Sequence, residues 1–230
     1  TLGKTLAERE HEALVCLDMA LQRGGDQVVM KNDAGTFFFG GLTKSQQKRS
    51  GGHSRVIANR LCSMISGSSN VIVMGHANPD FDSIGACVGI ASLCMHLGVR
   101  VKIVTDVNSE NFKACTSRLC ELADYKDIFV DDTVGLEESE FGSLLIIVDA
   151  NNFKILEEPA IAEKAQNFAI IDHHRKSNDF IQNAIITYHE PYASSTCEIA
   201  TEIMQYIDTG RTMTTFEAMA LYVGIIMDTK

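Results

Sequence analysis

Three short apolar runs in this chain each end in side chains that can bind a metal ion. The runs, residues 71–74, 144–148 and 168–171, are rich in β-branched side chains, which is typical of buried strands. The side chains that follow them are His76, Asp80 and Asp82, then Asp149, then Asp172, His173 and His174. A carboxylate beside a buried strand must be paired or solvated, so three such endings indicate one shared polar cleft. Open α/β sheets place their active sites at the carboxyl ends of parallel strands, and the sequence predicts that arrangement.

The expected fold is a doubly wound α/β domain over residues 55–230, with a mainly parallel sheet and flanking helices. A chain of 230 residues, 45% of them hydrophobic, can bury the core of one such domain and carry an appendage. The strands are expected near residues 71–75, 100–104, 144–148 and 168–171.

Two helices are expected to border the cleft. Residues 84–97 are apolar at helical spacing, which places residues 76–82 and their three potential ligands on a strand-to-helix loop. Thr214, with Glu217 three residues later, predicts the start of another helix. That helix ends at Asp228, so a helix rather than a strand supplies the last acid.

A further helix start is expected just after the third ligand group. Ser195 and Glu198 form a capping-box pattern that begins a helix running to Tyr206. Hydroxyls and free N–H groups at a helix N-terminus attract phosphate, so Ser194, Ser195 and Thr196 are candidate substrate contacts. Capping alone is the alternative explanation for these three side chains.

The residue types of the cleft suit phosphodiester hydrolysis with two metal ions. This reaction needs a nucleophilic hydroxide at neutral pH and positive charge on the phosphoryl oxygens, which two divalent ions roughly 3.5–4 Å apart provide. Carboxylates with a minority of imidazoles favour Mn²⁺, with Mg²⁺, Fe²⁺, Co²⁺ or Zn²⁺ as substitutes. Each motif alone is explained by a solvated turn or a helix cap, whereas the ordered set indicates a metal centre.

The ordered set resembles the DHH phosphoesterase family, which combines a His-x₃-Asp-x-Asp loop, an isolated strand-end Asp, an Asp-His-His signature and a later Asp. The resemblance implies two ion sites with the following ligands: His76 and Asp80 at one, Asp82, His173 and Asp228 at the other, and Asp149 bridging them. It also implies that His174 and Arg175 face the scissile phosphate, while Asp172 supports them from behind.

Residues 1–43 are expected to form a helix and a β-hairpin ahead of the domain. The helix is predicted over residues 6–21 and the hairpin over residues 26–41. Residues 17–28 resemble the tail of the degenerate GGDEF domain in GdpP-type cyclic-di-AMP phosphodiesterases, where Leu-Asp-x-Ala-Leu-x-Arg-Gly-Gly-Asp-Gln-Val leads into a hairpin. A generic helix–hairpin appendage is the alternative. Residues 44–54 are predicted to be a basic linker.

The combined resemblance implies a manganese-dependent phosphodiesterase that opens cyclic di-AMP to linear 5′-pApA by in-line attack of hydroxide. Within the same enzyme class, the alternatives are a hydrolase of nanoRNA or 3′-phosphoadenosine phosphate, an exonuclease and a manganese pyrophosphatase. Outside that class, the alternative is a module that binds cyclic dinucleotides without turnover, although a sensor has no need of six metal ligands.

Two features separate the chain from complete GdpP-type enzymes. Those enzymes show a stretch containing His-Arg-Pro after the bridging Asp, whereas this chain has Ala150, Asn151, Asn152 and Phe153. They also continue into a second domain that grips substrate with a Gly-rich loop. The sequence is therefore expected to be part of a longer protein, with weak turnover of its own because remote substrate contacts position the reacting centre.

Composition restricts the partners and the compartment. The net charge of −10 disfavours a stable nucleic-acid partner. The seven cysteines are scattered without Cys-x₂-Cys pairs, as expected of buried thiols in a reducing cytoplasm: Cys16, Cys62, Cys87, Cys94, Cys115, Cys120 and Cys197. The resemblance implies a homodimer whose parent protein is tethered to the membrane upstream of residue 1, with this soluble part on the cytoplasmic side.

Overall fold

The structure is a computed structural model that describes residues 5–22, 27–32, 35–40, 51–139, 142–176, 179–207, 210 and 212–229. Contacts divide the chain into two units, Thr1–Ser50 and Gly51–Lys230. The predicted basic linker lies outside the described residues up to residue 50. Helix α2 (Gly51–Ser66) then begins within the stretch of residues 44–54 that was predicted to be linker.

The first unit contains the predicted helix and hairpin. Helix α1 (Leu6–Gln22) precedes two antiparallel strands, β1 (Gln27–Asn32) and β2 (Gly35–Gly40). The helix contacts the hairpin through the ion pair between Lys31 Nζ and Glu12 Oε2, which are 2.6 Å apart. All six residues of β2 are exposed within this unit.

The second unit is built on a six-stranded sheet in which every neighbouring pair is parallel. Its strand order is β5-β4-β3-β6-β7-β8. The strands are β3 (Val71–Met74), β4 (Val101–Val104), β5 (Phe129–Val130), β6 (Leu144–Val148), β7 (Asn167–Asp172) and β8 (Ile186–His189). The four predicted strands and the doubly wound fold are confirmed, and the two edge strands β5 and β8 are additional.

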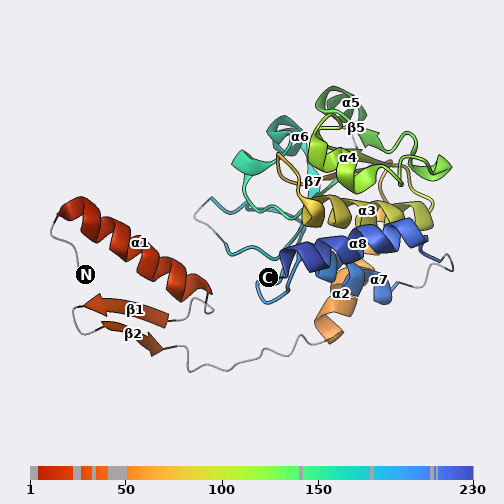
Figure 1. The fold of residues 1–230 in the computed structure, drawn as a ribbon. Helices are drawn as coiled ribbons and strands as arrows, with labels where there is room; N and C mark the ends of the chain where they lie inside the picture. Colours follow the sequence, from red (N-terminus) through yellow and green to blue (C-terminus); the bar gives the residue numbers. More distant parts are fainter. Residues whose placement is uncertain are drawn as a thin grey trace. The chain divides into compact units, whose positions relative to one another are not determined.

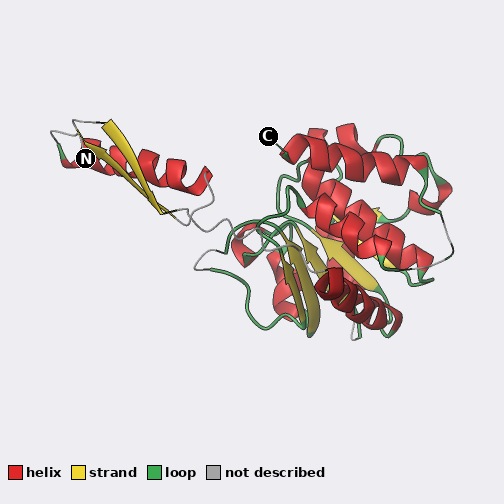
Figure 2. Cartoon of the chain, turned by 90° about the horizontal axis from the view of Figure 1, so that it is seen from below, coloured by secondary structure: helices red, strands yellow, loops and turns green. Residues whose placement is uncertain are grey.

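Helices cover both faces of this sheet (Figure 1, Figure 2). One face packs against α2, α3 (Phe81–His96), α7 (Thr196–Gln205) and α8 (Thr215–Asp228). The opposite face packs against α5 (Asp132–Glu138) and α6 (Pro159–Lys164). Alternate residues of each central strand point to opposite faces, and because both faces are covered the strands are apolar throughout. Helix α4 (Glu110–Thr116) packs on α3, and short 3₁₀ turns lie at Ala123–Tyr125 and Phe153–Ile155.

Helices α3 and α8 lie side by side, in contact at two glycines (Figure 1). A Cβ atom added to Gly85 of α3 would lie 2.6 Å from the Ala220 backbone oxygen. A Cβ atom added to Gly224 of α8 would overlap Cys197 Sγ and lie 3.0 Å from the Phe81 backbone oxygen. Only a residue without a side chain therefore permits this approach, which holds the first turn of α3 against the last turns of α8.

The helix starts agree with the sequence at α7 and α8 and differ at α3. At α8, Thr214 and Glu217 form the predicted capping box. Helix α3 begins at Phe81 rather than Ile84, with Asp80 as its N-cap, so Asp82 lies in the first helical turn and not on the loop. The reason is that the Asp80 carboxylate accepts the backbone N–H groups of Asp82 and Ser83.

At α7, the predicted capping box is only half formed. Ser195 Oγ accepts the backbone N–H of Glu198 at 3.0 Å, as predicted. The Glu198 carboxylate instead accepts the backbone N–H and the hydroxyl of Ser194, at 2.7 and 2.8 Å. Among the described helices of both units, none is long and apolar enough to cross a membrane.

Candidate metal centre

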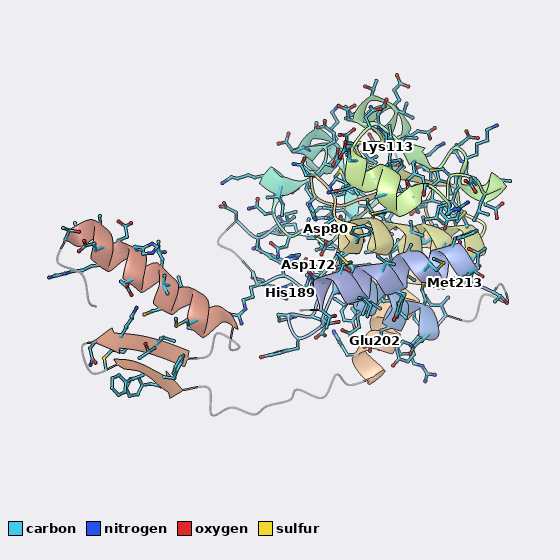
Figure 3. All side chains as sticks on the ribbon, in the orientation of Figure 1. Asp80, Lys113, Asp172, His189, Glu202 and Met213 are labelled. Atoms are coloured by element: carbon cyan, nitrogen blue, oxygen red, sulfur yellow. The ribbon has the colours of Figure 1, made fainter. Side chains whose placement is uncertain are left out.

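The potential ligands converge where the strand order reverses. Strands β3 and β6 are neighbours, yet the chain leaves β3 toward β4 on one side and leaves β6 toward β7 on the other. In open α/β sheets the loops diverge at this point and leave a crevice outside the carboxyl ends of the strands. The residues after β3 and β6 are those that the sequence singled out. Figure 3 shows Asp80, and Asp172 at the end of β7, toward the same end of α3 and α8.

Three groups of side chains have potential ligand atoms within 4.8 Å of one another. The groups are His76, Asp80 and Asp149; Asp82, His173 and Asp228; and Asp149, His173 and His174. These residues come from the loop after β3, the first turn of α3, the ends of β6 and β7 and the last residue of α8. All six predicted metal-binding residues therefore lie in one cluster.

Asp149 occupies the middle of the cluster and is 1% exposed. Its Oδ2 lies 3.5 Å from His76 Nε2, and its Oδ1 lies 3.7 Å from His173 Nε2. The two oxygens of one carboxylate thus face the two imidazoles that belong to separate groups. Asp149 has a positive φ of 56°, a conformation that Asp tolerates better than most residues and that is frequent at functional sites.

The surroundings of His173 Nε2 show that these residues fit a cation. Its Nε2 atom is buried and forms no hydrogen bond with any described residue. Three carboxylate oxygens surround it, from Asp228 at 3.2 Å, Asp149 at 3.7 Å and Asp82 at 3.8 Å. Ligand atoms about 2.1 Å from an octahedral ion lie about 3 Å from their neighbours, so this spacing fits shared coordination. A divalent cation would satisfy the imidazole and neutralise the carboxylates together.

The N-terminus of α7 holds two of the carboxylates in place. Asp82 accepts the backbone N–H of Thr196 at 2.7 Å and that of Cys197 at 2.9 Å. The Thr196 hydroxyl donates to Asp149 Oδ1 at 2.9 Å. A helix N-terminus stabilises negative charge, so α7 orients one carboxylate from each of two ligand groups. The sequence indicated Thr196 as a possible substrate contact and did not reveal this role.

The three candidate hydroxyls after β8 all bond within the protein. Ser194 donates to Glu198, Ser195 caps α7 and Thr196 donates to Asp149. Ser195 and Thr196 are completely buried. The capping alternative therefore accounts for Ser195, while Thr196 supports the cluster.

Asp172 lies behind His174, away from solvent. It is completely buried, and its Oδ1 atom lies 2.9 Å from His174 Nδ1. The His174 side chain is 54% exposed, and Arg175 next to it is exposed as well. The backbone carbonyl of His174 also contacts Nε2 of His189, the last residue of β8. His174 is thus fixed at one end and open to solvent at the other.

This combination of strand-end acids and histidines is matched by a known family. Residues 70–225 match the DHH family, N-terminal domain. The chain belongs to the DHH family. It is 39% identical over 219 residues to the cyclic-di-AMP phosphodiesterase GdpP of Bacillus subtilis and 36% identical over 217 residues to the cyclic-di-AMP phosphodiesterase PdeA of Listeria monocytogenes. Each match covers 93% of this chain and 33% of the relative, so the chain spans about a third of their length.

More distant similarities point to the same fold. A probable manganese-dependent inorganic pyrophosphatase of Streptococcus mutans is 29% identical over 127 residues, which cover 55% of this chain and 38% of that protein. The crystal structure of an exopolyphosphatase-related protein from Bacteroides fragilis superposes with a TM-score of 0.60 at 20% identity, over 76% of this chain and 50% of that one. The predicted resemblance to GdpP-type DHH phosphoesterases is confirmed.

The charges of this DHH domain shift the pKa values of its own ligands. The carboxylates of Asp149 and Asp80 raise the pKa of His76 to about 10, and His76 lowers the pKa of Asp80 to about 2. The Asp172 carboxylate raises the pKa of His174 to about 9. Burial raises the pKa of Asp149 to about 6. At neutral pH the imidazoles of His76 and His174 therefore carry protons.

Mn²⁺ binding is expected to release protons and to strengthen as pH rises. A histidine binds a metal only when neutral, so a cation must displace the proton that the raised pKa keeps on His76 at neutral pH. Calorimetric titration at pH 7 in two buffers of different ionisation enthalpy measures the number of protons released. Equal apparent enthalpies in both buffers, or tighter binding at pH 6 than at pH 8, would contradict the expectation.

Thr196→Val is expected to lower the rate of metal-dependent hydrolysis about 10-fold or more, since partners behind metal ligands contribute about 10- to 100-fold. Valine keeps the shape of the side chain and the backbone bond to Asp82 but removes the hydroxyl bond to Asp149. Thr201→Val is the matched control, because the Thr201 hydroxyl donates to the Cys197 backbone carbonyl within α7. Equal rates for the two variants would show that the Thr196 hydroxyl is dispensable.

Proposed function

We propose that this DHH domain is the metal-dependent catalytic half of a phosphodiesterase that hydrolyses cyclic di-AMP to 5′-pApA. The observation that carries the proposal is the placement of Asp149, whose two oxygens face His76 and His173 from separate ligand groups. The relatives named cyclic-di-AMP phosphodiesterases, 36–39% identical over 93% of the chain, support the substrate.

The protein side chains would form two neighbouring cation sites. His76 and Asp80 would hold one ion, Asp82, His173 and Asp228 the other, and Asp149 both. Mn²⁺ suits this set of carboxylates and imidazoles. When bound, the ions activate water at neutral pH and supply positive charge to the phosphoryl oxygens.

His174 supplies a further positive charge at the exposed side of the cluster. Its raised pKa keeps the ring protonated at neutral pH, and its side chain is accessible to a bound phosphate. With Arg175, it would bind the phosphoryl oxygens and stabilise the charge that develops on them. Asp172 holds the His174 ring from the buried side.

A substrate panel tests this proposal. The chain is incubated with Mn²⁺ and cyclic di-AMP, cyclic di-GMP, pApA, 3′-phosphoadenosine phosphate, short RNA or pyrophosphate, and with EDTA as the blank. Preferential formation of pApA from cyclic di-AMP supports the proposal. Turnover of only linear substrates would indicate a nanoRNA-type hydrolase, and binding of cyclic di-AMP with no product in Mn²⁺ would indicate a sensor.

Pyrophosphate is the second candidate substrate. The similarity to the Streptococcus mutans protein covers 127 residues, which is 55% of the chain. Pyrophosphate hydrolysis faster than cyclic di-AMP hydrolysis would favour this candidate. The length of the similarity favours the phosphodiesterase, since the GdpP relatives match over 219 residues.

A further inference from the structure

Asn151 lies two residues after Asp149, on the loop that follows β6. Its side chain is 5% exposed. Its Nδ2 donates to Asp172 Oδ2 at 2.6 Å and approaches the backbone carbonyls of His174 at 3.3 Å and Arg175 at 3.4 Å. One amide group thus contacts three of the four residues of the Asp-His-His-Arg segment, Asp172, His174 and Arg175.

The two carboxyl oxygens of Asp172 have different partners, Asn151 and His174. Oδ2 accepts from Asn151 Nδ2, and Oδ1 faces His174 Nδ1 at 2.9 Å. Because Asp172 is completely buried, each oxygen needs its partner, and an ionised oxygen left without one costs free energy. The amide of Asn151 therefore holds the Asp172 carboxyl group in the orientation that directs Oδ1 at His174.

The backbone of Asn151 is anchored independently of its side chain. Its carbonyl oxygen accepts the backbone N–H of Ile181 at 2.8 Å. The neighbouring Asp149 backbone N–H donates to the Ile171 carbonyl at 3.0 Å, which ties the end of β6 to β7. Changing the Asn151 side chain is thus expected to leave the loop in place and to disturb the hydrogen bonds beyond it.

We propose that Asn151 is a positioning residue that, through Asp172, fixes the orientation of the His174 imidazole for phosphodiester cleavage. The proposal rests on the function proposed above. A histidine whose Nδ1 is bound by a carboxylate presents its other nitrogen to the substrate, and the carboxylate keeps that orientation only while its own second oxygen is satisfied. Asn151 acts on His174 without contact to the reacting atoms.

The test compares Asn151→Ala and Asn151→Asp with Asn152→Asp. The first variant removes the amide, and the second keeps its shape but replaces the donor with an acceptor. Asn152→Asp is the matched control, because the Asn152 Oδ1 atom accepts the Lys154 backbone N–H and an aspartate oxygen does the same. Hydrolysis of bis-p-nitrophenyl phosphate by the whole chain in Mn²⁺ reports on the reacting centre without nucleoside recognition.

Both Asn151 variants are expected to lower kcat about 10- to 100-fold, with little change in KM or in the Mn²⁺ dissociation constant. The double variant Asn151→Ala/His174→Ala is expected to be no slower than His174→Ala alone, since both changes remove the same contribution. If the rate losses of the two single variants multiply in the double variant, the proposal is overturned. The proposal would also be overturned if the loss of activity in the Asn151 variants were fully explained by a loss of thermal stability.

A second readout does not depend on turnover. In the ¹⁵N-histidine-labelled chain, the His174 Nδ1–H proton is expected to give a low-field NMR signal that disappears in Asn151→Ala and persists in Asn152→Asp. An unchanged signal in Asn151→Ala would overturn the positioning role. Lack of Mn²⁺-dependent turnover in the unchanged chain, with the signal behaving as expected, would contradict the proposed function and leave the hydrogen-bond relay established.

Discussion

Asp149→Asn is expected to lower Mn²⁺-dependent hydrolysis about 1,000-fold or more. The change keeps the size of the side chain but removes the negative charge between the two ligand groups. Two ions supply several kcal/mol of transition-state stabilisation, and each 1.36 kcal/mol corresponds to a tenfold change in rate. The measurement is the rate of phosphodiester hydrolysis over a range of Mn²⁺ concentrations, because weakened binding must not be mistaken for a slower chemical step.

Asp106→Asn is the matched control for that variant. Asp106 also follows a strand of the sheet, β4, but it is exposed and lies in none of the three ligand groups. Its Oδ1 accepts the Asn108 backbone N–H, which an asparagine oxygen also does. An Asp149→Asn rate within tenfold of the control would contradict the role given to Asp149.

Gly224→Val is expected to destabilise the domain by about 3 kcal/mol or more, at the upper end of the cost of overpacking a core. For a domain of this size, that loss lowers the Tm by about 6–12 °C. A side chain at residue 224 overlaps Cys197 Sγ and approaches the Phe81 carbonyl and the Asp82 Cα atom, the last at 3.2 Å. The displaced α3 would also move Asp82, so Mn²⁺ binding weakens together with stability. Thermal unfolding with and without Mn²⁺ measures both effects.

Two further variants test the cause of that destabilisation. Cys197→Ala removes the sulfur atom that meets the new side chain, so it is expected to restore part of the stability lost in Gly224→Val. Gly52→Ala is the neutral control, because among the described residues a Cβ added there meets no atom within 4 Å beyond its chain neighbours and the backbone of its own helix. A Tm for Gly224→Val equal to that of Gly52→Ala would contradict the close contact between α3 and α8.

The positions of the metal-binding side chains were predictable because each follows a strong local signal. Buried parallel strands are apolar throughout, so Asp149 and Asp172 stood out at their ends. The capping pattern of Thr214 and Glu217 likewise fixed the helix that ends at Asp228. These signals lie within a few residues of the site positions, and the parallel topology then brings the strand ends together.

The remaining features depend on contacts that no local pattern records. Strand β5 has only two residues and β8 alternates buried and exposed positions, so neither gives a continuous apolar run. The bond from Thr196 to Asp149 spans 47 residues and the bond from Asn151 to Asp172 spans 21. The sequence alone does not distinguish a polar residue that caps a helix from one in a solvated turn or one that supports a metal ligand.

Counting the Mn²⁺ ions bound per chain, with electron paramagnetic resonance to detect their mutual coupling, tests the metal centre most directly. We expect two ions per chain with a coupled spectrum, and loss of the coupling in Asp149→Asn, because Asp149 faces both ligand groups. Hydrolysis should vanish in EDTA and return with Mn²⁺. Binding of no more than one ion at saturation, or full phosphodiesterase activity in EDTA, would contradict the two-metal site.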